Sequence, residues 1–375
     1  MKSNSTKNKT AYPYESYDSA VSEGIPVENI MLDYRIANTV GSMALNFIRQ
    51  HVSLANPGTK VLHTSSKFNV ESLSEDEVSD FVNIRTLNHI RYLNKFFEAV
   101  NRKIPENGVF IGTFETFGQR RRRIFSKYQK WLAAPIYFVD FMFHRVFPKV
   151  KITRKIYFFL TGGSNRVYSL TEVLGRLVSC GFDIVDYKAF EEQTYFAVKK
   201  ISDPEYNEEP SYGPLFRMRR IGKNGKVIHV YKFRTMHPYS EYLQRYIFER
   251  NNLQEGGKIK DDFRVTYWGR IMRKLWIDEL PMFINFFKGD LKLVGVRPLS
   301  THYLSLYDEE LREMRLKHKP GLLPPFYADL PKTLEEIINS EKNYLSAYEK
   351  YGVITDIKYL SKALYNILIK RARSN

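Results

Sequence analysis

Apolar residues along the chain follow two patterns, a helical spacing in some segments and short uninterrupted runs in others. A repeat every three or four residues is typical of a helix with one buried face, whereas a short run between turn residues is typical of a buried strand. The first pattern predicts helices over Met31–Gln50, Ser79–Arg102 and Val173–Ser179. The second predicts strands over Lys60–His63, Val109–Phe114, Phe182–Val185 and Thr194–Val198.

Local signals set the ends of these elements and of the domains. Ser169-Leu-Thr-Glu172 is a capping-box sequence at the start of the last helix, and Gly181 can end that helix in the left-handed conformation. Strands that alternate with helices predict an α/β layer, in which helices cover a sheet. Residues 1–28 are predicted to be disordered, because they are polar and lack periodicity. A polar, proline-flanked linker over 203–211 separates a first domain, 29–202, from a second, 212–375.

The composition fits globular domains with an acidic partner. Of the 375 residues, 43% are hydrophobic and 26% charged, and the formal charge is +17. Such a charge suits nucleic acid, anionic lipid or a phosphorylated substrate. No helix-turn-helix, zinc or RNA-binding signature accompanies it, so we expect no nucleic-acid partner. The single cysteine, Cys180, has neighbours typical of a buried, unreactive thiol.

The first domain resembles the closing part of a class I methyltransferase Rossmann fold. The resemblance lies in the helix, turn and strand from Phe97 to Ile111 and in the segments Leu170–Gly175, Cys180–Phe182 and Tyr195–Val198. A nucleotide-binding first turn in such a fold needs glycines, so that backbone N–H groups reach the ligand. The only candidate, Asn56-Pro-Gly58, precedes a strand instead of following one. We therefore expect a truncated, cofactor-free Rossmann-like scaffold, with an active methyltransferase as the alternative.

The second domain carries an ordered series of short motifs. In chain order they are Gly213-Pro-Leu-Phe216, Arg220-Ile-Gly222, Tyr231-Lys-Phe-Arg-Thr-Met236, Asp262-Phe-Arg-Val-Thr266, Gly269, Arg273, Asp278-Glu-Leu-Pro281, Asn285, Lys288-Gly-Asp290, Leu293-Val-Gly-Val-Arg-Pro298 and Lys319-Pro-Gly321. Together they resemble the monotopic polyprenyl-phosphate phosphoglycosyl transferases, a family of bacterial sugar transferases. Each motif alone is weak, whereas their order and short gaps over residues 213–321 are specific. The resemblance implies an α+β sugar-transferase domain after the Rossmann-like one.

The resemblance also implies an enzyme, a glycosyl-1-phosphate transferase. Its substrates would be a UDP-sugar and polyprenyl (undecaprenyl) phosphate, its product UMP, and its role the first step of exopolysaccharide, capsule or glycan synthesis. In the family the aspartate that matches Asp278 is the nucleophile of a covalent phosphosugar intermediate, and the glutamate that matches Glu279 helps to hold Mg²⁺. Both carboxylates are therefore the expected metal ligands.

The surroundings of this pair also suit phosphate chemistry. Pro281 is best tolerated in a first helical turn, which predicts the pair at a helix N-terminus, where backbone N–H groups favour phosphate. An ordinary acidic first turn is the alternative, because such turns are common. Four apolar residues are expected to anchor this helix to the core: Leu280, Phe283, Ile284 and Phe287.

Five basic residues are candidates for binding the substrate. Attack on a phosphorus shielded by anionic oxygens needs several cations, and a guanidinium fork suits bidentate phosphate binding. Arg273 and Arg297 match family arginines that contact the nucleotide-sugar phosphates or the uridine end. Lys232 and Arg234 alternate in a strand-like segment and are expected on one face, and Arg264 is a further candidate. The alternative for each is a solvated surface charge.

The segment before Gly213 departs from the family. Members carry a re-entrant hydrophobic helix there, whereas residues 183–212 here have the pattern of a strand, a linker and acidic residues. A run of about 18 apolar residues, as a spanning helix needs, is absent, because Pro135, Asp140 and Arg145 interrupt the nearest approach. We therefore expect peripheral attachment to the inner face of the cytoplasmic membrane.

Two segments are candidates for this attachment. One is the basic run Arg120–Arg123 with the aromatic segment Trp131–Val139 that follows it, and the other is Ile357–Arg373. Basic residues beside an aromatic and apolar segment suit an interfacial helix on anionic lipid. The alternative is that both apolar faces pack against the protein's own core. For the whole chain, the alternative to an enzyme is a non-catalytic partner or regulator in a polysaccharide-assembly complex.

Overall fold

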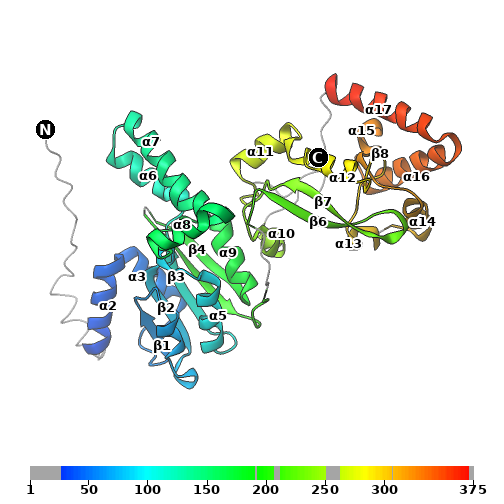
Figure 1. Ribbon diagram of the computed structural model, residues 1–375. Helices are drawn as coiled ribbons and strands as arrows, with labels where there is room; N and C mark the ends of the chain where they lie inside the picture. The colour runs from blue at the N-terminus through cyan, green and yellow to red at the C-terminus, as the bar shows by residue number, and fades with distance from the viewer. Residues whose placement is uncertain (1–26, 191, 207–211, 251–261, 306, 371–375) are drawn as a thin grey trace. The chain divides into compact units, whose positions relative to one another are not determined.

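A computed structural model describes residues 27–190, 192–206, 212–250, 262–305 and 307–370 (Figure 1). The chain divides into two compact units. The first comprises residues 1–210 and 238–244, and the second comprises residues 211–237 and 245–375. Most of the segment predicted to be disordered, residues 1–26, lies outside the described residues.

The first unit is built on a five-stranded sheet in the order β1-β2-β3-β5-β4. Its strands are β1 (Thr59–Leu62), β2 (Asp80–Thr86), β3 (Val109–Phe114), β4 (Phe182–Ala189) and β5 (Thr194–Lys200). The first three are parallel, and β5 runs antiparallel between β3 and β4. A sheet with this share of parallel strands, covered by helices, confirms the predicted α/β class.

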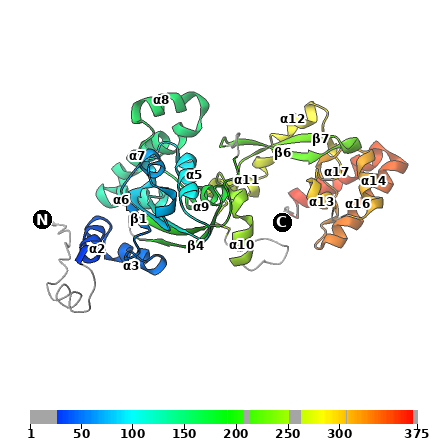
Figure 2. The same ribbon diagram turned by 90° about the horizontal axis from the view of Figure 1, so that it is seen from below.

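Helices cover both faces of this sheet (Figure 1, Figure 2). They are α2 (Val27–Val40), α3 (Ser42–His51), α4 (Phe68–Glu71), α5 (Leu93–Lys103), α6 (Phe117–Lys127), α7 (Lys130–Phe141), α8 (Lys151–Thr161) and α9 (Leu170–Ser179). Successive strand residues point to opposite faces. Phe81 of β2 therefore packs on Phe96 of α5, whereas the next residue, Val82, joins the cluster that includes Phe47 of α3.

Two of the predicted helices are wrong in part. Met31–Gln50 is divided into α2 and α3 at Gly41, whose φ is 87°. The first half of Ser79–Arg102 is strand β2 followed by a 3-10 turn, Leu87–His89, and only the second half is helical, as α5. β2 pairs with β1 on one side and β3 on the other. This pairing, which the local sequence does not reveal, overrides the helical spacing of the apolar residues.

The predicted ends of α9 are present. Ser169 Oγ accepts a hydrogen bond from the backbone N–H of Glu172 at 3.1 Å, and Gly181 has a φ of 84°. A Cβ on Gly181 would lie 2.1 Å from Ser202 O, so glycine is required there. Cys180 beside it is buried, and burial raises the pKa of its thiol to about 12. The thiol is therefore protonated and unreactive, as predicted.

The Glu172 carboxylate lies in a buried ion cluster. It accepts hydrogen bonds from Lys149 Nζ at 2.6 Å and Arg176 Nη2 at 3.1 Å, and it pairs with Arg145. Burial opposes ionisation of Glu172, but the three cations outweigh burial and hold its pKa well below the ordinary value. The cluster therefore joins α9 to the segment that follows α7.

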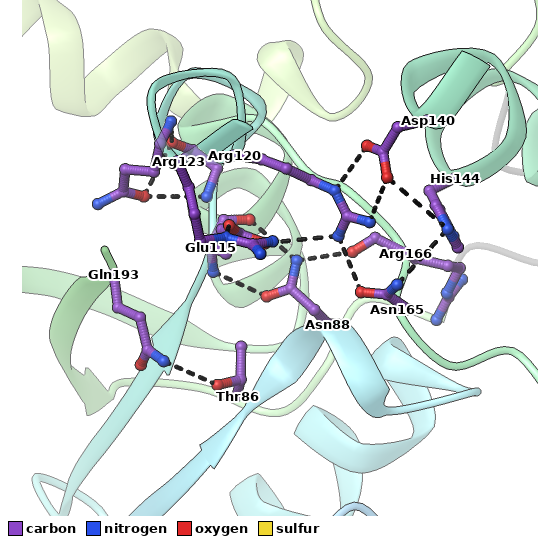
Figure 3. A network of polar contacts seen from close by, with 12 residues as sticks. Thr86, Asn88, Glu115, Arg120, Arg123, Asp140, His144, Asn165, Arg166 and Gln193 are labelled. Carbon is purple, nitrogen blue, oxygen red and sulfur yellow. Dashed lines mark hydrogen bonds and ion pairs between the residues drawn. The ribbon is translucent and has the colours of Figure 1, made fainter. Parts of the chain in front are cut away.

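A second polar network joins α6 to α7 (Figure 3). Arg120, only 4% exposed, donates two hydrogen bonds of 2.6 Å to Asp140 of α7 and one of 2.8 Å to Asn165 Oδ1. Arg123 donates to Glu115 Oε1 at 2.7 Å. Two arginines of the basic run Arg120–Arg123 are thus bound by carboxylates of the same unit.

Residues 238–244 belong to the first unit, although they lie within the predicted second domain. Their 3-10 turn, Ser240–Leu243, packs on α9. The Tyr239 ring lies 4.5 Å from the guanidinium carbon of Arg176, and its hydroxyl accepts a hydrogen bond from Asn94 at 2.8 Å. A Cβ on Gly175 would lie 2.2 Å from Tyr239 O, so this packing requires glycine in α9.

The second unit contains two small sheets. A hairpin pairs β6 (Leu215–Ile221) with β7 (Val227–Phe233), and β8 (Lys292–Val294) pairs in parallel with β9 (Gly321–Leu323). The helices after β7 are α10 (Gln244–Arg250), α11 (Tyr267–Lys274), α12 (Met282–Phe287), α13 (Thr301–Ser305), α14 (Glu309–Lys317), α15 (Phe326–Asp329), α16 (Leu334–Tyr351) and α17 (Val353–Leu368). A core cluster of Val294, Leu311 and Tyr344 joins β8 to α14 and α16.

The helices are short or amphipathic. Within the described ranges we find no helix with the length and hydropathy needed to cross a bilayer. The segment nearest to a span in sequence is α7, which contains Pro135 and continues into one turn of π-helix, Met142–Val146. The connection from β1 to α4, residues 63–67, contains no glycine. The cofactor-free scaffold and the likeness to methyltransferases stay predictions.

Candidate active site

The pair Asp278–Glu279 lies in a 3-10 turn, Ile277–Glu279, between α11 and α12. Trp276 precedes the turn with a φ of 57°, a left-handed conformation that is unusual for a bulky residue. Its ring packs 4.8 Å from the Tyr327 ring, which holds the chain in this conformation. The pair was predicted at a helix N-terminus, and it lies in this 3-10 turn, which leads through Leu280 and Pro281 into α12 at Met282.

Lys232 of β7 contacts this turn directly. Its Nζ donates to Glu279 Oε1 at 2.5 Å, and the two side chains are only 15% and 28% exposed. Burial raises the pKa of Asp278, the charge of Glu279 raises it further, and Lys232 and Arg273 oppose this shift. The structure thus brings together two carboxylates and two cations from three predicted motifs.

Arg273 reaches the pair from α11. Its Nε donates to Thr235 Oγ1 at 3.0 Å, just beyond the end of β7. A Cβ on Gly269 would lie 2.0 Å from Thr235 O, so α11 approaches this segment only through a glycine. Thr235 was not among the residues predicted for the site, although it lies inside the Tyr231–Met236 motif.

Arg264 is buried and bound to Asp262. It is 4% exposed, and its Nε and Nη2 donate to Asp262 Oδ1 at 2.9 Å and Oδ2 at 2.7 Å. Burial acts to raise the pKa of Asp262, but the hydrogen bonds and charge of Arg264 outweigh it and lower the pKa. The Arg264 carbonyl also accepts a hydrogen bond from His237 N at 2.8 Å. These contacts favour a role in holding the segment, and substrate binding by Arg264 stays a prediction.

The contacts described for Arg234 and Arg297 are with other residues. Arg234 Nε donates to Gly213 O at 3.0 Å, and the guanidinium lies 5.2 Å from the Phe216 ring centroid. Lys232 and Arg234, expected on one face, therefore contact different parts of the unit. Arg297 is exposed. The pKa of Arg220 is lowered, mainly by the burial of Arg220 and further by the charge of Arg297. Their roles in substrate binding stay predictions.

Asn285 is the residue that holds α12 against β7. It is fully buried, donates from Nδ2 to His229 O at 2.7 Å, and accepts at Oδ1 from Tyr231 N at 3.0 Å. Both partners lie in the strand that carries Lys232. Asn285 is therefore a positioning residue for the turn at Asp278, a role that its place in the motif series did not reveal.

The apolar residues of α12 face solvent. The expectation that they anchor the helix in the core was wrong, because Met282 and Asn285 are the buried residues. The exposed fractions are 52% for Leu280, 42% for Phe283, 41% for Ile284 and 82% for Phe287. An apolar surface therefore adjoins the acidic pair.

Known proteins resemble the second unit in sequence. Residues 207–370 match the family model described as bacterial sugar transferase. Over 162 residues the chain is 32% identical to the galactosyl transferase CpsE of Streptococcus agalactiae, which covers 42% of this chain and 35% of that protein. It is 38% identical over 109 residues to the exopolysaccharide production protein ExoY of Sinorhizobium fredii, covering 28% of this chain and 48% of that protein.

A third relative carries a more detailed name. It is the UDP-N-acetylgalactosamine-undecaprenyl-phosphate N-acetylgalactosaminephosphotransferase of Aeromonas hydrophila, 37% identical over 117 residues. The match covers 30% of this chain and 25% of that protein. The chain thus spans between a quarter and about half of the length of these three relatives.

Proposed function

We propose that the chain, whose residues 207–370 match the bacterial sugar transferase family, transfers a sugar phosphate from a UDP-sugar to polyprenyl phosphate. The observation that carries the proposal is the cluster of Asp278 and Glu279 with Lys232 and Arg273 inside the family segment. The name of the Aeromonas hydrophila relative supports a UDP-sugar donor and an undecaprenyl-phosphate acceptor. The ExoY name supports a role in exopolysaccharide production, and we place the reaction at the start of that synthesis.

Asp278 is the nucleophile in this proposal. Its carboxylate attacks the phosphorus that bears the sugar, and the bond from that phosphorus to the UMP oxygen breaks, so that UMP leaves with the electron pair. The sugar phosphate is then bound to Asp278 as an acyl phosphate. A phosphate oxygen of polyprenyl phosphate attacks the same phosphorus, which frees the carboxylate and yields the polyprenyl-diphospho-sugar.

The cations around the pair supply electrostatic stabilisation. The charges of Lys232 and Arg273 both act on Asp278, and they would balance the charge of the substrate diphosphate in a partly shielded site. Within the described residues no group of three or more His, Cys, Asp or Glu side chains forms a complete metal site. Mg²⁺ is commonly bound by one or two carboxylates together with substrate phosphates and water, and Asp278 and Glu279 fit that donor set. When bound, Mg²⁺ would neutralise phosphoryl oxygens, and Glu279 would bind Mg²⁺ in place of Lys232.

The acceptor places the reaction at a membrane. Polyprenyl phosphate lies in the bilayer with its phosphate at the surface, so the site must reach that surface. The exposed apolar side chains beside the pair, Leu280, Phe283 and Phe287, suit contact with lipid. We therefore place the protein peripherally on the inner face of the cytoplasmic membrane.

The test is the release of UMP by the purified chain. It is incubated with Mg²⁺, detergent-dispersed undecaprenyl phosphate and a panel of UDP-sugars, and UMP is measured. At least one donor should give UMP, and Asp278→Asn should reduce the rate at least about a thousandfold. Glu279→Gln should raise the Mg²⁺ concentration needed for half-maximal rate, whereas Glu313→Gln, exposed on α14, should leave both unchanged.

A second assay addresses the intermediate. Without acceptor, a donor labelled in the phosphate next to the sugar should label the wild-type protein and leave Asp278→Asn unlabelled. Normal turnover by that variant would overturn the nucleophile assignment. Absence of UMP with every donor would favour the alternative, a non-catalytic partner or regulator of polysaccharide assembly.

A further inference from the structure

The segment from α6 to α8 in the first unit has an uneven charge distribution. Residues 117–162 contain eleven basic residues and one acidic residue, Asp140. Four of the cations are bound inside the unit, Arg120 by Asp140, Arg123 by Glu115, and Arg145 and Lys149 by Glu172. Six further cations of the segment are exposed to solvent: Arg121, Arg122, Lys127, Lys130, Arg154 and Lys155.

α7 adds large apolar side chains to this basic region. Trp131, Phe138 and Val139 are 70%, 64% and 65% exposed, and Ala133 is the buried residue of the helix. The two hydrogen bonds from Arg120 to Asp140 fix α7 to α6 (Figure 3). The exposed apolar residues are therefore carried on a helix whose position is held by buried charge.

α8 presents an apolar stripe to solvent. Ile152, Ile156 and Phe159 are 81%, 56% and 88% exposed, and their spacing places them on one face of the helix. Tyr157 points the other way, fully buried, with its ring 5.3 Å from Phe143 and its hydroxyl donating to Ser164 O at 2.7 Å. One face of α8 thus packs on the unit while the apolar face stays uncovered.

A basic pocket lies beside this stripe. Arg91, Arg154, Lys155, Phe158, Phe159 and Gly162 line a surface cavity of about 520 Å³. The guanidinium carbon of Arg91 lies 5.5 Å from the Phe158 ring centroid. Three cations without a carboxylate in the lining suit a phosphate group, and Phe159, an exposed member of the lining, suits an adjoining acyl chain.

We propose that α7 and α8 form a membrane-binding surface on the first unit and that this surface binds anionic phospholipid, with a headgroup phosphate between Arg91, Arg154 and Lys155. Apolar helices flanked by lysine and arginine have the composition of interfacial helices. A second copy of the chain is a poor occupant, because a symmetric contact would bring the same exposed cations against each other. The inference rests on the proposed function only for the reason why the protein needs a membrane surface. Lipid binding itself is measured without turnover.

The experiment is vesicle flotation of the full chain. The vesicles are phosphatidylcholine alone or an equal mixture with phosphatidylglycerol. The chain should float with the mixed vesicles and not with phosphatidylcholine alone, and high salt should release it, because salt screens attraction to anionic lipid. Ile152→Ser with Phe159→Ser should lower the vesicle-bound to free ratio at least about tenfold. Arg154→Glu with Lys155→Glu should lower it at least about tenfold as well.

Matched controls lie on the same unit. Phe68 of α4 is 71% exposed, and Arg102 of α5 is exposed. Phe68→Ser and Arg102→Glu should float like the wild type, and all variants should show the wild-type circular dichroism spectrum. Flotation of either double variant at the wild-type level would overturn the proposal. Equal binding of the wild type to both vesicles, or self-association that only the apolar double variant abolishes, would also overturn it.

Catalysis and lipid binding are separated by two further measurements. Asp278→Asn should float like the wild type. The apolar double variant should release UMP at the wild-type rate from detergent-dispersed acceptor, and at a reduced rate from acceptor in vesicles. Flotation without UMP release by the wild type would overturn the proposed function and leave the membrane surface standing.

Discussion

Lys232 Nζ and Glu279 Oε1 lie 2.5 Å apart, and this contact joins the β6–β7 hairpin to the turn that carries the proposed nucleophile. Replacement of Lys232 by Met keeps the aliphatic stem and removes the charge. We expect the rate of UMP release to fall at least about tenfold, because a cation facing the substrate phosphates is lost. The free energy of unfolding should change by less than about 1 kcal/mol, because the ion pair is partly exposed.

Lys226→Met is the matched control, since Lys226 lies exposed at the turn of the same hairpin. It should leave the rate unchanged. A Lys232→Met enzyme with wild-type kcat and KM would remove Lys232 from the site.

The dependence of the rate on pH reports the protonation of Asp278. Attack requires the carboxylate, so the rate should fall as pH falls through the pKa of Asp278. Burial raises that pKa above the ordinary 3.8, and the acid limb should therefore lie above the position expected for an exposed aspartate. Lys232 opposes the shift, so Lys232→Met should move the acid limb to still higher pH. An acid limb at the same pH in both proteins would contradict this.

The Asp262–Arg264 pair should stabilise the second unit. Asp262→Asn removes the carboxylate that binds the buried guanidinium, and we expect a loss of about 2–4 kcal/mol in the free energy of unfolding, measured in urea. The pKa of Asp262 is lowered in the folded chain, so its contribution is fully present above the ordinary value of 3.8 and disappears as pH falls through the lowered pKa. The difference between wild type and variant should therefore be constant between about pH 5 and 7 and shrink in acid.

Gly175→Ala tests the packing of residues 238–244 on α9. The added methyl would lie 2.2 Å from the Tyr239 carbonyl, so the segment must shift, and we expect a loss of about 1–3 kcal/mol. Limited proteolysis should cut within the segment sooner than in the wild type. Gly118→Ala in α6 is the control, because the nearest atom there is 3.9 Å away, and it should leave both measurements unchanged or slightly improved.

The residues of the candidate site could be selected from the sequence because they stand in short motifs. Asp278, Glu279 and Arg273 were identified from the family resemblance and Lys232 from its place in a strand-like motif, and the structure brings the four together. Their roles stay predictions. The surroundings of these four residues were harder to predict from the sequence. An apolar stripe predicts a buried helix face, but α12 turns that face outward, because Asn285 fixes the opposite face against β7. No pattern along α12 predicts that Asn285 forms hydrogen bonds with β7, a strand some fifty residues earlier in the chain.

The same limit explains the errors in the first unit. β2 was predicted as part of a helix, because its own sequence contains no sign of the two strands that pair with it. The basic run Arg120–Arg123 was predicted as one surface, whereas Asp140, twenty residues further along the chain, binds Arg120, and Glu115 just before the helix binds Arg123. Conversely, caps and left-handed glycines such as Gly181 depend on nearest neighbours and were predicted correctly.

The return of residues 238–244 to the first unit constrains how such a protein can be assembled from parts. A gene fragment that ends at residue 210 would leave Gly175 and Arg176 without Tyr239, and a fragment that begins at 211 would expose Leu243, which is fully buried here. A swap of the first unit for one from another protein would therefore succeed only with a matching 238–244 segment.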